Sequence, residues 1–240
     1  MIKNVDWVVS VSSFLKEELM NKFRICGDRI IVEPMGVRQD FLGLGVSKNV
    51  ARRMLGLKRD EFYVGYTGKV FRGQQEMEWL MEVARMLGDI NFLVVGGRPD
   101  VVEYYRDLCV QRGIDNMCFV GFVSPSEVIM YQRAVDVLVV YFGEDIGLTA
   151  KYGSPGKLPE YMASGVPIVA GDYPSVTDLL RHGESALVIP PGKPHLLAKA
   201  IMELKQNPDR GRKLAKDARR RVENLVWEKR AKRILERILK

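Results

Sequence analysis

The stretch Tyr152-Gly-Ser-Pro-Gly-Lys-Leu-Pro-Glu-Tyr-Met-Ala-Ser-Gly-Val-Pro-Ile-Val-Ala170 has the composition of a loop, a helix, a tight turn and a buried strand, in that order. Pro159 cannot donate a backbone hydrogen bond, so it fits best within the first helical turn. Gly165 is suited to end the helix, because glycine adopts a left-handed conformation without strain. The helix is therefore predicted at 156–164, and the apolar residues after it predict a strand at 167–169.

The same alternation of apolar strands and amphipathic helices extends over most of the chain. Strands are predicted at 62–67, 91–95, 117–120, 136–140, 167–169 and 186–189. Helices are predicted between them, at about 75–87, 100–112, 125–133, 156–164, 174–181 and 194–205, and two more close the chain at about 209–223 and 226–239. Continuous apolar strands that alternate with helices are typical of a parallel sheet. The predicted fold class is α/β, with a Rossmann-like parallel sheet of about six strands and helices on both faces.

One strand and one helix precede this alternation. The Val-rich run Val5-Asp-Trp-Val-Val-Ser-Val11 predicts a buried strand. Ser12 and Ser13 are good caps for the helix that follows, and Glu17 lies within capping-box range. The helix is expected to end near Gly27. This pair of elements resembles an orphan unit more than a domain of its own.

A short strand at 29–32 leads from this unit into an irregular stretch, predicted to be a linker that extends to about Val46. We therefore divide the chain into three segments. Residues 1–46 form the N-terminal unit with its linker, residues 47–222 form the Rossmann-like domain, and residues 223–240 form a C-terminal amphipathic helix. The last segment is expected to pack back on the N-terminal unit.

The composition excludes several classes of protein. The chain has 240 residues, of which 47% are hydrophobic, as in ordinary globular domains. No run of 18 apolar residues predicts a membrane span, and the first residues lack the order of a signal peptide. The 3 cysteines form no closely spaced pair, so neither a disulfide framework nor a zinc site is expected. The default location is a reducing cytoplasm.

The positive charge gathers at the C-terminus. Residues 205–240 hold 14 lysines and arginines against 5 acidic residues, whereas the net charge of the whole chain is +7. Two interpretations of the last helix remain open. It is a solvated helix with one apolar face packed on the body, or a basic helix that rests on an anionic membrane surface. Nucleic-acid binding is not expected, because the sequence has no recognition motif and no stretch in which basic residues alternate with aromatic residues.

Two glycine-rich loops follow predicted strands. The first is Gly65-Tyr-Thr-Gly-Lys-Val-Phe-Arg-Gly73, in which Gly68 allows close approach while Lys69 and Arg72 are suited to a diphosphate. The alternative is a surface turn with two solvated cations. The second loop contains Gly96 and Gly97, where a plain turn is as reasonable as a ligand contact. Neither loop has a Walker or dinucleotide-binding glycine pattern.

The helix that starts near residue 156 carries the strongest candidate site. Ser154 and Pro155 are good helix-start residues, and the unpaired amides of the first turn can hold an anion. Gly156 keeps the approach open, Lys157 adds positive charge, and Glu160 is placed to accept vicinal hydroxyls such as those of ribose. The alternative is a helix with an exposed Lys–Glu pair, although glycine and two prolines are poor choices for helix stability alone.

The order of these parts is similar to the nucleotide-binding C-terminal half of two-Rossmann-domain (GT-B) glycosyltransferases, the retaining "glycosyl transferases group 1", family 4 type. The resemblance runs over nearly the whole chain. Its most specific part is Gly-Ser-Pro-Gly-Lys-Leu-Pro-Glu-Tyr-Met-Ala-Ser-Gly-Val-Pro-Ile-Val-Ala, which resembles the donor-binding motif. The loop Gly-Lys-Val-Phe-Arg-Gly resembles the family loop normally written Gly-Arg-Leu…Lys-Gly. The family's interdomain linker resembles the stretch Val-Glu-Pro-Met-Gly-Val-Arg-Gln-Asp-Phe. The last strand and helix of its N-terminal domain resemble Val-Asp-Trp-Val-Val-Ser-Val-Ser-Ser-Phe-Leu-Lys.

The resemblance implies roles for these residues. Lys69 and Arg72 would be catalytic and would stabilise the departing diphosphate. The residues implied to bind a UDP or GDP sugar are Gly68, Gly96, Phe122, Val123, Ser154, Pro155, Gly156, Lys157 and Glu160, with Glu160 on the ribose and the segment around Gly121 beside the base. Transfer would retain stereochemistry and need no metal and no cofactor beyond the nucleotide sugar.

Two differences from the family pattern stand out. The donor motif usually has a glutamate eight residues before Glu160, and this chain has Tyr152 there. The acceptor domain that forms the N-terminal half of the family is represented only by its last strand and helix. We therefore expect this chain to bind donor and to be weakly active or inactive alone, with an acceptor domain in cis or in trans. The alternatives are a non-catalytic nucleotide-sugar-binding subunit and a nucleotide-sugar epimerase of the same fold.

Overall fold

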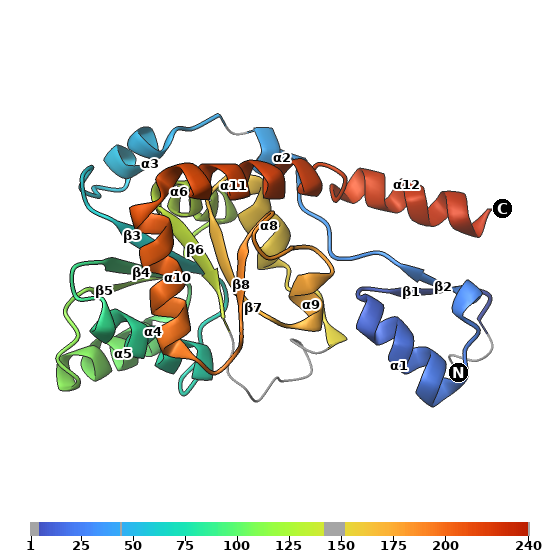
Figure 1. Cartoon of the computed structure of the whole chain (residues 1–240), viewed down its shortest axis with the longest axis horizontal. Helices are drawn as coiled ribbons and strands as arrows, with labels where there is room; N and C mark the ends of the chain where they lie inside the picture. Colours follow the sequence, from blue (N-terminus) through green and yellow to red (C-terminus); the bar gives the residue numbers. More distant parts are fainter. Residues whose placement is uncertain (1–4, 44, 142–151, 240) are drawn as a thin grey trace.

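The body of the protein is a single parallel sheet between two layers of helices (Figure 1). The structure is a computed structural model that describes residues 5–43, 45–141 and 152–239. Six strands lie in the order β5-β4-β3-β6-β7-β8, all parallel to their neighbours. Their bounds are β3 Tyr63–Thr67, β4 Asn91–Val95, β5 Met117–Gly121, β6 Val137–Val140, β7 Ile168–Gly171 and β8 Leu187–Ile189. The predicted α/β, Rossmann-like fold class is confirmed.

The alternation of side chains along each strand divides the core into two halves. Val64 and Tyr66 of β3 pack under one layer of helices, while Tyr63 of the same strand faces the other layer. The first layer contains α4 (Gln75–Met86), α5 (Pro99–Gln111) and α10 (Pro194–Gln206). The second contains α6 (Pro125–Ala134), α8 (Lys157–Ser164) and α9 (Pro174–Thr177), and α11 (Pro208–Val222) reaches both halves.

A side-chain network fixes the amino-terminal ends of β3 and β6. The carboxylate of Asp136 pairs with Lys48 and with the buried guanidinium of Arg52, at 2.6 Å in each case. The same carboxylate accepts the backbone N–H of Tyr63 at 2.8 Å. Asp136 therefore joins the helix α3 (Lys48–Met54) to the sheet at the end opposite to the carboxyl ends of the strands, which makes it a structural residue.

Two short helices occupy a region for which no helix was predicted. The stretch up to residue 46 was expected to be irregular, but it contains α2 (Gln39–Gly43), and α3 (Lys48–Met54) follows. Phe41 of α2 is buried in the same half of the core as α8. Helices of five to seven residues are too short to show a helical period of apolar residues in the sequence. They are stabilised mainly by packing on the rest of the protein. The helix predicted at 174–181 is also shorter, because α9 ends at Thr177.

The N-terminal unit has a small sheet of its own, separate from the main sheet. Strands β1 (Val8–Ser10) and β2 (Ile30–Val32) form a two-stranded parallel sheet, and α1 (Ser13–Phe23) packs on it. β1 is shorter than the predicted run, and Val9 is exposed. α1 ends before Gly27, and its third residue is Leu15, so the predicted capping box with Glu17 does not form.

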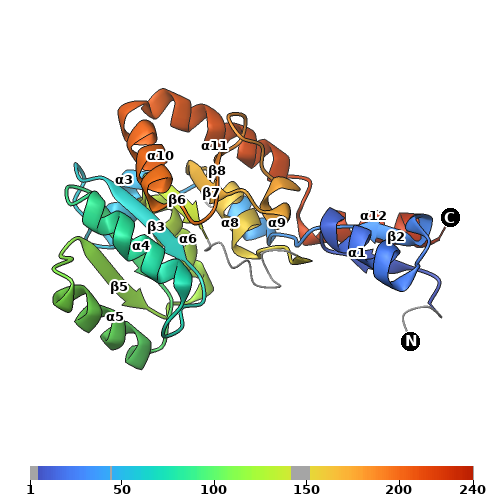
Figure 2. The same cartoon turned by 60° about the horizontal axis from the view of Figure 1, so that its bottom comes forward.

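Helix α12 (Trp227–Ile238) extends beyond the sheet to the same side as the N-terminal unit (Figures 1 and 2). Arg233 pairs with Glu33 at 2.7 Å, and Arg230 donates to the carbonyl of Pro34 at 2.8 Å. None of its residues is buried. The helix thus contacts the linker, while the division of the chain into three segments stays a prediction. In the described part of the chain, no helix has the length and apolar character needed to cross a membrane.

The hydroxyl of Ser12 connects α1 to the body, and its removal should be measurable. It accepts the N–H of Leu15 at 3.2 Å and donates to the carbonyl of Tyr152 at 2.9 Å. Ser12→Ala is expected to lower the free energy of unfolding by about 1 kcal/mol, because an N-cap is lost. Ser13→Ala is the matched control, since the hydroxyl of Ser13 makes no hydrogen bond within the described part of the chain and its backbone N–H, which bonds to Asp178 at 2.7 Å, is retained. Equal stabilities of the two variants in urea denaturation would contradict this role.

Candidate functional site

A cleft of about 1140 Å³ opens at the carboxyl ends of the strands. It lies where the strand order reverses between β3 and β6, the position at which open α/β sheets bind ligands. Four segments line it: the loop after β3 with the start of α4, the glycines after β4, the residues after β5, and the start of α8. The cleft is therefore built from loops that are far apart in the sequence.

The structure brings nearly all the predicted site residues to this cleft. Those that line it are Gly68, Lys69, Arg72, Gly96, Phe122, Val123, Pro155, Gly156, Lys157 and Glu160. Ser154 does not line it. Its hydroxyl accepts the backbone N–H of Met35 at 3.1 Å, so it bonds to the linker instead. The helix also starts one residue later than predicted, with Gly156 as N-cap and no side-chain cap.

Close backbone packing explains the glycines on the floor of the cleft. A Cβ added to Gly96 would lie 1.8 Å from the carbonyl oxygen of Gly68, and the φ of Gly96 is +132°. The N–H of Gly96 also bonds to the carbonyl of Gly121 at 2.8 Å. Only glycine fits this crossing of two loops, so the turn after β4 is required by packing as well as by the open cleft.

The ammonium of Lys157 lies deep in the cleft. It donates to the hydroxyl of Tyr66 at 2.7 Å, and it is 4.0 Å from the centroid of that ring. A Cβ on Gly68 would be only 3.0 Å from the Lys157 Nζ. Burial lowers the pKa of Lys157 to about 8, against the opposing effect of the carboxylates of Glu76 and Glu160. Lys157 is thus a partly desolvated cation beside the glycine-rich loop that follows β3.

Glu160 lies one turn into α8 and is held by a residue that the sequence did not single out. The amide Nε2 of Gln132 bonds to Thr67 Oγ1 at 3.0 Å and to Glu160 Oε2 at 3.4 Å. Gln132 is fully buried. Burial raises the pKa of Glu160, while the bond from Gln132 and the charges of Arg38 and Lys157 lower it. The carboxylate is therefore an oriented acceptor at the wall of the cleft.

Tyr161 fixes the helix start relative to β3. Its hydroxyl accepts the N–H of Thr67 at 2.7 Å and donates to the carbonyl of the same residue at 3.0 Å. The side chain is fully buried, and this burial raises the pKa of its phenol. Because both groups of Thr67 are satisfied from α8, Lys157 and Glu160 hold a fixed position against the loop after β3.

The two cations of that loop differ in their surroundings. Arg72 donates to the carbonyl of Asp100 at 3.0 Å and lies 5.6 Å from the ring centroid of Tyr104, so it is held against α5. Lys69 is exposed, and its ammonium has no ion-pair partner in the described part of the chain. Lys69 is exposed to an approaching anion, whereas one nitrogen of Arg72 is already bonded to Asp100.

Tyr152, which takes the place of an acid in the donor motif, lies outside the cleft. Its ring centroid is 5.5 Å from that of Phe14, and the ammonium of Lys22 lies 6.0 Å from it. Both partners belong to α1. The side chain therefore packs on the N-terminal unit and not beside Lys157. Among the residues that the structure describes, no cluster of three or more metal-ligating side chains occurs.

Comparison with known sequences agrees with this geometry. Residues 61–207 match the family described as glycosyl transferases group 1, and the chain belongs to this family. An uncharacterized glycosyltransferase of Methanocaldococcus jannaschii is 27% identical over 198 residues, which are 80% of this chain and 48% of that protein. A D-inositol 3-phosphate glycosyltransferase of Corynebacterium glutamicum is 24% identical over 95% of this chain and 55% of its own length. The chain thus spans about half the length of these curated relatives.

Solved structures show the same fold. Sucrose-phosphate synthase of Thermosynechococcus elongatus is 27% identical, with a TM-score of 0.79 over 99% of this chain and 59% of that chain. HepE of Anabaena, crystallised with UDP and glucose, has a TM-score of 0.81 at 18% identity, over 98% of this chain and 63% of its own. The whole of this chain therefore corresponds to part of a larger GT-B fold.

Proposed function

We propose that this chain is the donor-binding half of a glycosyltransferase that uses a nucleoside diphosphate sugar. The observation that carries the proposal is the position of Lys157 and Glu160 on α8, one turn apart at the wall of the cleft. Family membership supports it, and so does the same-fold structure of HepE, which was crystallised with UDP and glucose. UDP is accordingly the first ligand to test.

The diphosphate would lie between the loop after β3 and the start of α8. The positive amino-terminal end of the α8 dipole would attract an anion together with the charge of Lys157. The N–H of Leu158 is already bonded to the carbonyl of Pro155 at 2.9 Å, and Pro159 has no N–H, so the side chain of Lys157 would supply most of this attraction. Lys69 would approach from the opposite side, and Arg72 would join after releasing Asp100. As the bond from the sugar to the diphosphate breaks, negative charge grows on the leaving phosphate oxygen. These cations would stabilise that charge.

The nucleoside would extend toward Glu160 and the loop after β5. The Glu160 carboxylate is suited to accept both ribose hydroxyls, and burial makes such charge-assisted bonds stronger than in water. Phe122 is 86% exposed at the edge of the cleft, next to Val123, and these apolar side chains would flank the base. Transfer with retention of stereochemistry and without a metal ion belongs to the same proposal.

The acceptor side would come from a domain that this chain does not include. Sucrose-phosphate synthase and HepE extend well beyond the part matched here, and the N-terminal unit has exposed apolar side chains such as Val9 of β1. We propose that an acceptor domain in cis or in trans completes the enzyme in the cytoplasm or at the membrane surface. The chain alone is expected to bind donor and to transfer little sugar.

Isothermal titration of the 240-residue chain tests the proposed function. The panel is UDP, GDP, UDP-glucose, UDP-N-acetylglucosamine, UDP-galactose and GDP-mannose, each with Mg²⁺ and with EDTA. At least one nucleoside diphosphate is expected to bind with a micromolar Kd that EDTA does not change. Lys69→Met should weaken this binding, whereas Lys58→Met should not, because Lys58 pairs with Glu61 elsewhere. No binding by any member of the panel would refute the proposal.

A further inference from the structure

The cleft contains a second half-buried carboxylate whose function is not explained by the sites above. Glu76 lies in the first turn of α4 and lines the cleft. In the described part of the chain, it makes neither a hydrogen bond nor an ion pair. Burial raises the pKa of its carboxyl group, and the charge of Lys157 opposes this shift. A desolvated carboxylate without a partner is costly to maintain unless a ligand supplies the missing donors.

The two carboxylates have the same cation in common. Lys157 interacts electrostatically with both Glu76 and Glu160, whereas neither carboxylate is among the groups that shift the pKa of the other. They also come from different elements, since Glu76 lies in α4 and Glu160 in α8. The cleft therefore contains two carboxylate acceptors that share the charge of Lys157.

A nucleoside diphosphate sugar has groups that suit two acceptors and a shared cation. Ribose hydroxyls lie at one end of the diphosphate and the hydroxyls of the transferred sugar lie at the other. Carboxylates are suited to hydroxyl donors, and a cation is suited to the phosphates between them. Tyr152 packs on Phe14 of α1, so it supplies no acceptor to the cleft.

On the basis of the function proposed above, we propose that Glu76 binds a hydroxyl of the donor sugar, opposite to the ribose site at Glu160. This assignment makes Glu76 a specificity-determining residue for the sugar. It also explains why an acid in the first turn of a helix faces a cleft without a partner.

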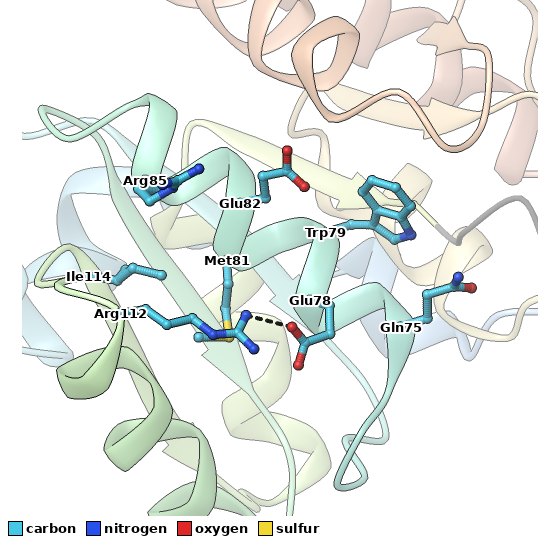
Figure 3. Close-up of a pocket in the computed structure, with 8 residues that line it drawn as sticks. All are labelled: Gln75, Glu78, Trp79, Met81, Glu82, Arg85, Arg112 and Ile114. Carbon is cyan, nitrogen blue, oxygen red and sulfur yellow. Dashed lines mark hydrogen bonds and ion pairs between the residues drawn. The ribbon is translucent and has the colours of Figure 1, made fainter.

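The alternative is that Glu76 only stabilises the start of α4, as acidic side chains do in a first helical turn. Glu78 provides the matched control, because it lies in the same turn and has the same charge. Its carboxylate pairs with Arg112 at 2.6 Å in a second cavity of about 580 Å³, which is lined by α4 and by residues that follow α5 (Figure 3). Substitution of Glu78 removes the same charge from the helix without changing the donor cleft.

The test compares wild type, Glu76→Gln and Glu78→Gln by titration with free UDP and GDP and with their four sugar nucleotides. Glu76→Gln is expected to weaken the binding of at least one sugar nucleotide about tenfold, as for the loss of a charged hydrogen bond. The affinity for the corresponding free nucleotide should change less than about threefold. Glu78→Gln should change neither. The retained affinity for the free nucleotide also shows that Glu76→Gln is folded.

Two results would overturn the assignment. In the first, Glu76→Gln weakens the binding of the free nucleotide as much as the binding of its sugar derivatives. In the second, Glu76→Gln binds every sugar nucleotide of the panel with the affinity of wild type. Both outcomes leave the proposed function intact, because the wild-type chain still binds nucleotide. Absence of all binding by wild type removes the proposed function and this assignment together.

Discussion

The affinity for UDP is expected to fall roughly hundredfold at pH 7 when Lys157 is replaced by methionine, as for the loss of a strong charge-assisted bond to a phosphate. The ammonium of Lys157 lies within the cleft, 2.7 Å from the hydroxyl of Tyr66. Methionine preserves most of the side-chain volume, so the loss reports on charge. Isothermal titration measures it, and the best nucleoside diphosphate of the panel replaces UDP if another binds better.

The same residue should make binding depend on pH. With a pKa of about 8, Lys157 is charged below pH 8 and becomes neutral above it in the free protein. The affinity of wild type is therefore expected to decrease between pH 8 and 10, by at most tenfold per pH unit. Lys69→Met should show the same decrease in affinity with pH, because Lys157 remains. The affinity of Lys157→Met should not change over this pH range. A decrease that persists in Lys157→Met would assign it to another group.

Stability gives an independent check of the same pKa. Lys157 has a folded-state pKa of about 8 against an ordinary value of 10.5. Between these values the unfolded chain binds more protons than the folded chain, so this residue makes the free energy of unfolding rise with pH. Wild type should therefore gain stability relative to Lys157→Met between pH 8 and 10.5, in denaturant titrations at fixed ionic strength.

Glu160→Ala is expected to weaken UDP binding by roughly ten- to hundredfold, because a buried acceptor for the ribose hydroxyls is lost. The effect should depend on the ligand. With 2′,3′-dideoxyuridine diphosphate, wild type and Glu160→Ala should bind equally, since the hydroxyls are absent. The four dissociation constants form a cycle that isolates the contact between Glu160 and the ribose.

The control for this cycle is Glu236→Ala, which removes an exposed acid on α12 that pairs with Lys232. It should bind both nucleotides as wild type does. If Glu160→Ala weakened the dideoxy ligand as much as UDP, the carboxylate would act on the cleft in general and not on ribose.

The central strands β3, β4 and β6 were predictable because each is a largely apolar run that is buried along almost its whole length. β3, β4 and β6 differ from their predicted ranges by no more than one residue at either end. The helices α2 and α3 were missed for the opposite reason. Neither is long enough for a helical period, and Phe41 becomes recognisable as a core residue only once α8 is in place.

The candidate site was predictable where one short segment contains the residues. Lys157 and Glu160 lie in one motif, so their spacing alone indicated a shared face. Gln132 and Glu76 could not be found this way, because their importance depends on contacts made by the tertiary fold. Gln132 stands between Tyr131 and Arg133 in the sequence, and nothing there distinguishes it from a solvent-exposed amide.

The bonds of Ser12 and Met35 with the segment before α8 have a mechanical consequence. Ser12 bonds to the carbonyl of Tyr152, and Met35 bonds to the hydroxyl of Ser154. Only two residues separate Ser154 from Lys157, the first residue of α8. With the donor site proposed above, a rotation of the N-terminal unit would pull on this segment, and donor binding would then be coupled reciprocally to the position of that unit.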